Sequence, residues 1–180
     1  MIDMGDIVSR RLILRLLSPE ALKAASEGDL ARLARLTGIS LSQKWAKIAR
    51  VAARRLEQIE ADPGYLPWSL RAIALRPSNE IIGYINFHAA PGADDLTLYA
   101  PNAVELGYAV IAKHRRQGYA GEAVRMMIAW ARKRGIQAFV FSISPDNSAS
   151  LALAAGLGAV KVGWRVDEED GLEDVYLLKP

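Results

Sequence analysis

The segment that most constrains the fold is a predicted strand that runs directly into a turn of small residues and then into a long helix. It covers residues 104–134 and begins VELGYAV. Gly118, Ala120 and Gly121 lie where the helix starts, and their small side chains leave the first backbone N–H groups uncovered. These N–H groups have no partner inside a helix and carry the positive end of its dipole, so a phosphate can bind there. The segment therefore predicts an anion-binding turn.

The rest of the chain predicts a mixed α/β fold. Residue patterns indicate a first strand at 10–17 and helices at 18–36 and 40–59. Further strands are expected at 70–75, 80–88, 104–111 and 137–144, helices at 117–134 and 147–157, and a final hairpin at 160–166 and 173–178. No linker, repeat or low-complexity tract appears, so the sequence predicts a single domain over residues 1–180.

Composition limits the possible chemistry. The chain contains no Cys, which excludes a disulfide framework, a thiolate zinc site and an acyl-cysteine intermediate. His88 and His114 have no partner at ligand spacing, so no metal site is expected. The first residues lack the apolar region of a signal peptide, and no uncharged apolar run reaches the length of a membrane span. We therefore expect a cytoplasmic protein with no membrane contact.

The small net charge of +3 conceals two oppositely charged segments. Residues 113–134 carry a net charge of +6, and residues 165–174 carry −5. The three basic residues at 132–134 match the dipole at the end of their helix, whereas Arg115 and Arg116 precede that helix and favour an anionic ligand. The basic segment has no interleaved solvent-facing aromatic residues, so nucleic acid is not an expected partner.

Several ordered motifs resemble the GNAT acyltransferase superfamily. Arg115-x-x-Gly118-x-Ala120 resembles the family's Arg/Gln-x-x-Gly-x-Gly/Ala signature, which binds the pyrophosphate of acetyl-coenzyme A (acetyl-CoA). The ELGY of residues 105–108, the PDNSAS of 145–150 and the opening at 10–20 resemble its RimJ/RimL-like branch, the ribosomal-protein N-terminal acetyltransferases. The resemblance is strong over 104–163, fair at 8–20 and 80–88, and weak between 21 and 75.

This resemblance implies a GNAT fold and acetyl-CoA as co-substrate. The implied sheet is mixed, mostly antiparallel, flanked by helices and splayed between its fourth and fifth strands, here 104–111 and 137–144. Backbone groups at a bulge in the fourth strand would pair with the pantetheine arm, which Asn147 would also bind. The implied cofactor residues are therefore Ala109, Val110, Ile111, Arg115, Arg116, Gln117, Gly118, Tyr119, Ala120, Gly121 and Asn147.

Acetyl transfer to an amine needs a base and a donor for the developing oxyanion. Glu105 matches the family's Glu and is the candidate base, acting through a water, or else it only orients the substrate. The backbone N–H near Val110 or Ile111 is the candidate oxyanion donor.

The departing thiolate needs an acid, and here the sequence departs from a common family pattern. Many members have a Tyr seven residues after the Asn, a position that is Ala154 in this chain. In the RimJ/RimL-like branch a Ser takes this role, which implies Ser150, although a helix Ser that packs near the pantetheine is the alternative. Tyr108 and Tyr176 stay open as donors.

The predicted function is that of an acetyl-CoA-dependent N-acetyltransferase, a monomer or homodimer in which a primary amine attacks the thioester directly. The amine is either a protein N-terminus or a small molecule. Because Ala154 replaces the Tyr, a non-catalytic acyl-CoA-binding protein of the same fold is the second hypothesis. Trp45, Tyr65 and Trp68 come from the region where the family builds its acceptor site, and each either lines that site or packs in the core.

Overall fold

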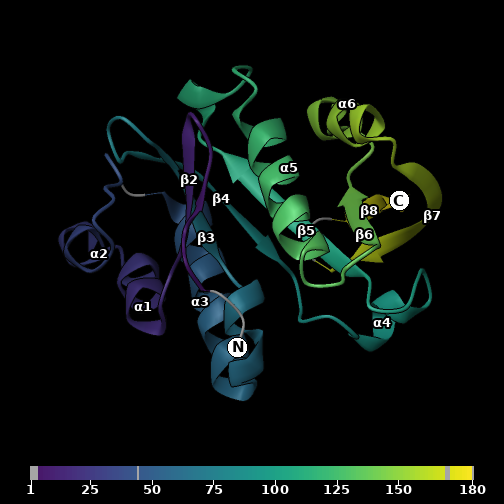
Figure 1. Cartoon of the computed structure of the whole chain (residues 1–180), viewed down its shortest axis with the longest axis horizontal. Coiled ribbons are helices and arrows are strands. Elements are labelled where there is room, and N and C mark those ends of the chain that lie inside the picture. Colours follow the sequence, from purple (N-terminus) through teal and green to yellow (C-terminus); the bar gives the residue numbers. More distant parts are fainter. Residues whose placement is uncertain (1–3, 44, 169–170, 180) are drawn as a thin grey trace. The chain divides into compact units, whose positions relative to one another are not determined.

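The computed structural model describes residues 4–43, 45–168 and 171–179 (Figure 1). The chain divides into two compact units, which we describe separately. Unit 1 consists of residues 1–87 and 108–130, and unit 2 consists of residues 88–107 and 131–180. Each unit contributes residues that the sequence assigns to a site.

The described residues form eight strands in an open, mixed sheet of order β1-β2-β3-β4-β5-β6-β8-β7. Their bounds are β1 Ile7–Val8, β2 Leu12–Leu16, β3 Arg71–Leu75, β4 Ile81–Phe87, β5 Val104–Val110, β6 Phe139–Ile143, β7 Val160–Asp167 and β8 Gly171–Leu178. β5 pairs with β6 in parallel, whereas β1–β2, β2–β3, β3–β4, β6–β8 and β7–β8 are antiparallel pairs. The predicted α/β class, with a mostly antiparallel mixed sheet and flanking helices, is confirmed.

Unit 1 contains the helices α1 Pro19–Glu27, α2 Leu30–Thr37 and α3 Ala46–Ala61, the short 3-10 helices η1 Pro63–Trp68 and η2 Ala112–His114, and most of α5 Tyr119–Arg132. The prediction of one helix over 18–36 is wrong. Gly28 adopts a left-handed conformation (φ 69°) that ends α1, and the Asp29 side chain then accepts a hydrogen bond from the N–H of Arg32, which starts α2.

The core of unit 1 accounts for two of the aromatic residues whose role the sequence left open. The rings of Trp68 and Trp130 pack edge to face with centroids 5.1 Å apart, and Phe87 lies 5.7 Å from Trp68. Tyr65 is buried and donates a hydrogen bond of 2.6 Å to the carbonyl of Phe87. Tyr65 and Trp68 therefore pack in the core, and the half-buried Trp45 stacks at 5.5 Å against another ring.

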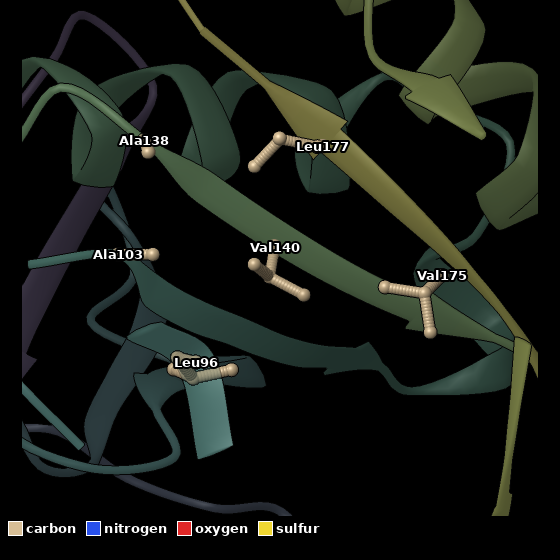
Figure 2. Close-up of a cluster of buried hydrophobic side chains, with 6 residues drawn as sticks. All are labelled: Leu96, Ala103, Ala138, Val140, Val175 and Leu177. Carbon is tan, nitrogen blue, oxygen red and sulfur yellow. The ribbon is translucent and has the colours of Figure 1, made fainter. Parts of the chain in front are cut away.

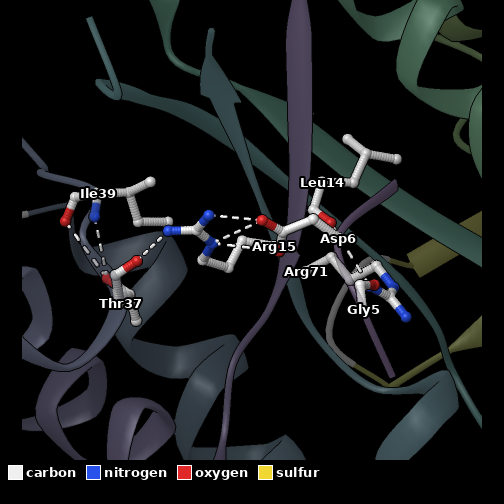
Figure 3. A network of polar contacts seen from close by, with 7 residues as sticks. All are labelled: Gly5, Asp6, Leu14, Arg15, Thr37, Ile39 and Arg71. Carbon is white, nitrogen blue, oxygen red and sulfur yellow. Dashed lines mark hydrogen bonds and ion pairs between the residues drawn. The ribbon is translucent and has the colours of Figure 1, made fainter. Parts of the chain in front are cut away.

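A polar network ties the first strands of unit 1 to the end of α2 (Figure 3). The Arg15 guanidinium forms an ion pair with Asp6 and also donates to the carbonyl of Thr37. This pairing with Asp6 raises the pKa of Arg15, so the charge of the guanidinium persists at any physiological pH. The Thr37 hydroxyl donates 2.6 Å to the carbonyl of Leu33, one turn back in α2. The network anchors β2 from both sides.

Unit 2 contains α4 Asp94–Thr97, α6 Ser148–Leu157 and the strands β6, β7 and β8. Figure 2 shows a cluster of buried side chains, in which Leu96 of α4 lies below the strand that carries Val140. The cluster is completed by Ala103, Ala138, Val175 and Leu177. It fixes the beginning of β5 against β6, where Val104 pairs with Phe139 and Glu105 with Val140.

β5 belongs to both units, since residues up to Gly107 lie in unit 2 and those from Tyr108 in unit 1. The splay between β5 and β6 therefore stays a prediction. Near the expected bulge, the Ala109 carbonyl oxygen lies so close to Gly83 of β4 that a Cβ on Gly83 would meet it at 2.4 Å. Only glycine tolerates this approach, so Gly83 shapes the strand at the residues assigned to the pantetheine.

Candidate functional site

The predicted anion-binding turn lies in unit 1, between η2 and the start of α5. Arg115, Arg116, Gln117 and Gly118 are exposed, and Tyr119, Ala120 and Gly121 are half-buried. Arg116 and Gly118 both have positive φ, of 59° and 80°, so the chain coils tightly before the helix begins. This geometry leaves the helix start accessible, as anion binding requires.

Arg11 holds this turn, and the sequence analysis did not single it out. Its Nη1 donates 3.2 Å to the carbonyl of Gln117, and its Nε donates 2.7 Å to the Glu122 carboxylate in the first turn of α5. Its guanidinium also lies 4.7 Å from the centroid of the Tyr119 ring. The Ser9 hydroxyl donates to the second oxygen of Glu122. Arg11 thus links the loop, the helix and the β1–β2 connection.

One residue in the sequence points to this contact between Arg11 and the turn. Glu122 is the single acid among the seven basic residues of 113–134. Burial raises the pKa of the Glu122 carboxyl, but the hydrogen bonds from Ser9 and Arg11 and the charge of Arg11 lower it more, so the net shift is downward. An isolated acid inside a basic segment indicates a specific partner, although the sequence does not reveal that the partner lies more than a hundred residues away.

Backbone hydrogen bonds at the end of β5 bear on which N–H could donate to the oxyanion. Ile111 N–H donates 2.8 Å to the carbonyl of Ile82, and the Val110 carbonyl accepts 2.9 Å from the Arg115 Nε. The Ile111 N–H is therefore already used by the sheet. Of the two candidate oxyanion donors, the Ile111 N–H is the one that this hydrogen bond disfavours.

Asn147 and Ser150 come together in unit 2 at the start of α6. Asn147 is the N-cap residue, and its side-chain oxygen accepts 3.2 Å from the backbone N–H of Ser150. Both residues lie at the accessible end of the helix, since Asn147 is exposed and Ser150 half-buried. Because the cap uses the carbonyl oxygen of Asn147, a hydrogen bond to a ligand would come from its amide nitrogen.

Glu105 lies at the centre of a charged array in unit 2. It is 3% exposed, and its two oxygens accept 2.6 Å and 3.1 Å from Nη2 and Nη1 of Arg165. Arg165 Nε in turn donates 3.2 Å to Glu173, and the Nδ1 of His88 lies 3.5 Å from Glu105 Oε2. Four charged or titratable groups, from β5, β7, β8 and the residue that follows β4, therefore meet around the buried Glu105 carboxylate.

This array sets the protonation state of Glu105. Burial raises the pKa of its carboxyl, but the hydrogen bond and charge of His88 and the charge of Arg165 lower it more, to about 2. At neutral pH the carboxylate is ionised and a weak proton acceptor, because a general base works best with a pKa near the working pH. Of the two roles that the sequence left open, this environment favours orientation over proton removal.

Membrane-spanning helices and metal-binding clusters were sought in the described residues only. No helix there is long and apolar enough to cross a membrane. Nor do these residues include a group of three or more His, Cys, Asp or Glu side chains placed to hold a metal ion.

The fold and the turn define the class of protein. The Acetyltransferase (GNAT) domain family matches residues 11–160, and the chain therefore belongs to this family. A curated relative, aminoglycoside N(6')-acetyltransferase type 1 of Klebsiella aerogenes, is 35% identical over 91 residues, which is 49% of this chain. The match spans 59% of that relative's length.

Solved structures share the fold at low sequence identity. The ribosomal-protein-S5-alanine acetyltransferase of Vibrio fischeri has a TM-score of 0.66 at 16% identity, covering 97% of this chain and 96% of its own. RimL, a ribosomal L7/L12 alpha-N-protein acetyltransferase solved in complex with coenzyme A, has a TM-score of 0.64 at 20% identity and 97% coverage of both chains.

Proposed function

We propose that this protein is an acetyl-CoA-dependent N-acetyltransferase. The observation that carries the proposal is the turn of Arg115–Gly121 at the start of α5, held by Arg11 and matching the family's pyrophosphate signature. The family match over residues 11–160 supports it independently. Bound acetyl-CoA would supply an activated acetyl group as its thioester.

Different residues of the chain would bind different parts of the co-substrate. Backbone N–H groups from Arg116 to Gly121 would bind the pyrophosphate with the charges of Arg115 and Arg116 nearby. Backbone groups of Ala109–Ile111 and the Asn147 amide would bind the pantetheine arm. Val110 N–H would donate to the oxyanion as the amine attacks the carbonyl carbon.

For the departing thiolate we propose Ser150 as the proton donor. Its place in the first turn of α6, where positive dipole charge accumulates, would also favour a developing negative charge nearby. In this proposal the amine attacks the thioester directly, which is the simplest mechanism for a chain that has no Cys to form an acyl-cysteine intermediate.

The acceptor is a primary amine of one of two kinds. Structural neighbours named as ribosomal-protein acetyltransferases favour a protein N-terminus and a place in the RimJ/RimL-like branch. The aminoglycoside acetyltransferase, which has the higher identity, favours an amino sugar or another small amine.

A thiol-release assay separates these possibilities. Purified protein and acetyl-CoA would be offered N-terminal peptides, aminoglycosides and polyamines, and we expect release of coenzyme A with one class. Acetyl-CoA binding without turnover of any amine would instead favour the non-catalytic acyl-CoA-binding protein. Gly118→Asp, which places a carboxylate in the turn, should abolish both binding and release.

A further inference from the structure

We propose that Arg11 is a positioning residue of the acetyl-CoA site, and that it holds the turn before α5 in the conformation that binds the pyrophosphate. This proposal rests on the N-acetyltransferase function and assigns a role in ligand affinity to a residue outside the family's pyrophosphate signature. Arg11 precedes Gln117 of the turn by 106 residues. Arg11 and the residues that it contacts all belong to unit 1.

The turn contains a strained residue that needs support from outside. Arg116 has a φ of 59° and lies two residues before Gly118, whose φ is 80°. A non-glycine residue is uncommon in this left-handed region and stays there only where surrounding contacts hold it. Gln117 lies between these two residues, and Arg11 Nη1 donates 3.2 Å to its carbonyl. The hydrogen bond from Arg11 therefore acts at the middle of the strained segment.

The guanidinium of Arg11 contacts both sides of the turn. Its Nε donates 2.7 Å to one oxygen of Glu122 in α5, and its Nη2 lies 2.6 Å from the same oxygen. The ring of Tyr119, the first residue of α5, lies 4.7 Å from the guanidinium. Because a guanidinium is planar and rigid, its contacts with the helix fix the direction of the donor that reaches Gln117.

Ser9 fixes both members of the Arg11–Glu122 pair. Its hydroxyl oxygen accepts 2.9 Å from the N–H of Leu12 and 3.3 Å from the N–H of Arg11. The same hydroxyl donates 2.7 Å to the second oxygen of Glu122. Both oxygens of the carboxylate are therefore engaged by the β1–β2 connection, which ties the start of α5 to that connection.

Geometry rather than charge is what Arg11 contributes to ligand binding. A Cβ on Gly118 would lie 3.5 Å from Nη2 of Arg11, so the guanidinium borders the turn. Its charge is paired with Glu122, and a paired guanidinium attracts a phosphate less than an unpaired one does. A turn that already has the binding conformation binds more tightly, because the apparent Kd rises as the fraction of molecules in that conformation falls.

The first test measures the acetyl-CoA Kd of Arg11→Gln and Arg11→Lys by calorimetric titration. We expect the Kd of Arg11→Gln to rise roughly tenfold or more. Arg11→Lys keeps the charge but lacks the planar fork, and should also bind more weakly than the wild type. Arg15→Gln is the matched control, because Arg15 likewise pairs with an acid, Asp6, and donates to a carbonyl, that of Thr37, away from the turn. It should lose stability and keep the wild-type Kd.

Glu122→Gln separates positioning from a direct effect of charge. A carboxylate near a bound phosphate repels it, so Glu122→Gln would tighten acetyl-CoA binding if Arg11 acted on the phosphate only as a charge. Positioning predicts the opposite, a higher Kd, because the substitution weakens the contact that directs Arg11. The double variant should bind no more weakly than the weaker single variant, since the two side chains act as one unit.

Steady-state kinetics with the acceptor found in the thiol-release assay distinguish positioning from a general loss of folded protein. Arg11→Gln should raise the KM for acetyl-CoA and keep kcat, whereas partial unfolding would lower kcat and keep KM. A wild-type Kd in Arg11→Gln, or tighter binding in Glu122→Gln, would overturn the role of Arg11 and leave the proposed function intact. Failure of the wild-type protein to bind acetyl-CoA would overturn both.

Discussion

At the scale of single residues, burial decides chemical roles that the sequence leaves open. Glu105 matches a family motif, and the motif alone is compatible with a base or an orienting carboxylate. Its bidentate pair with Arg165 and its pKa of about 2 favour the orienting role. A buried carboxylate held this way is also a pH-dependent stabiliser of the fold.

Glu105→Gln should therefore change the acid stability of the protein. Because the folded pKa lies below the value of about 4.3 for an unfolded Glu, the stabilisation is present above pH 4.3 and lost as the pH falls toward 2. Urea unfolding across pH 2–7 should show that the wild-type protein loses on the order of 3 kcal/mol more than the variant over this range. Glu57→Gln, at an exposed position of α3, should behave as the wild type. Parallel curves for wild type and Glu105→Gln would contradict the prediction.

Asn147 offers a way to separate a structural role from a binding role. Asp caps a helix as well as Asn does, but it lacks the amide donor. Asn147→Asp should keep the stability of the protein and weaken acetyl-CoA binding, whereas Asn147→Ala should weaken binding and also cost about 1 kcal/mol of stability. Calorimetric titration and urea unfolding measure the two effects. Wild-type affinity in Asn147→Asp would remove the amide from the site.

At the scale of elements, the β5–α5 connection is a turn built by backbone conformation and locked by long-range contacts. Gly118 supplies a left-handed residue just before α5, and Arg11 reaches from the β1–β2 connection to hold both the loop and the helix. The helix ends in the same way, since Gly135 also has a positive φ of 86°. α5 thus has a left-handed glycine near each end, but only one of them lies in the proposed site.

The left-handed glycines at the two ends of α5 allow a matched pair of variants. Gly118→Ala and Gly135→Ala impose similar left-handed strain, of roughly 1–2 kcal/mol, because a Cβ at either position meets nothing closer than 3.5 Å. Both should lower the unfolding free energy by a similar amount. Gly118→Ala alone should raise the acetyl-CoA Kd, by roughly tenfold or more, since the methyl group stands where the phosphate approaches. Equal affinities in the two variants would exclude the turn from the binding site.

At the scale of the whole molecule, ligand binding should raise the free energy of unfolding and the Tm of the protein. A ligand present at 100 times its Kd stabilises the folded state by about 2.7 kcal/mol. For a chain of this length, that corresponds to a rise in Tm of roughly 5–10 °C. Thermal unfolding followed by circular dichroism should show this shift with acetyl-CoA and with coenzyme A, and no shift in Gly118→Asp. An unchanged wild-type Tm at millimolar acetyl-CoA would argue against both proposed functions.

The parts of the molecule that follow from sequence are those determined by neighbouring residues. The α5 turn, the helix that starts near Asn147 and the final hairpin each depend on residue types within a short stretch, where helix ends and turns have strong preferences. The helix predicted over 40–59 begins only at Ala46, since Ser40 forms a β-bridge with Glu80. Local chemistry explains the other failure, the break in the helix predicted over 18–36. Gly28 ends α1 and Asp29 starts α2, but the apolar residues on both sides keep helical spacing, so the break is not visible in the pattern.

Only the tertiary structure decided which distant charges meet. Glu105 and Arg165 are 60 residues apart, and Arg11 and Glu122 are 111 apart. Arg165 on β7 contacts Glu105 on β5 although β6 and β8 lie between these strands in the sheet order. Strand order and register are set by packing over the whole sheet rather than by local preference. The sequence by itself therefore determined the family and predicted the anion-binding turn, while the fold determined that the buried Glu105 faces His88 and Arg165.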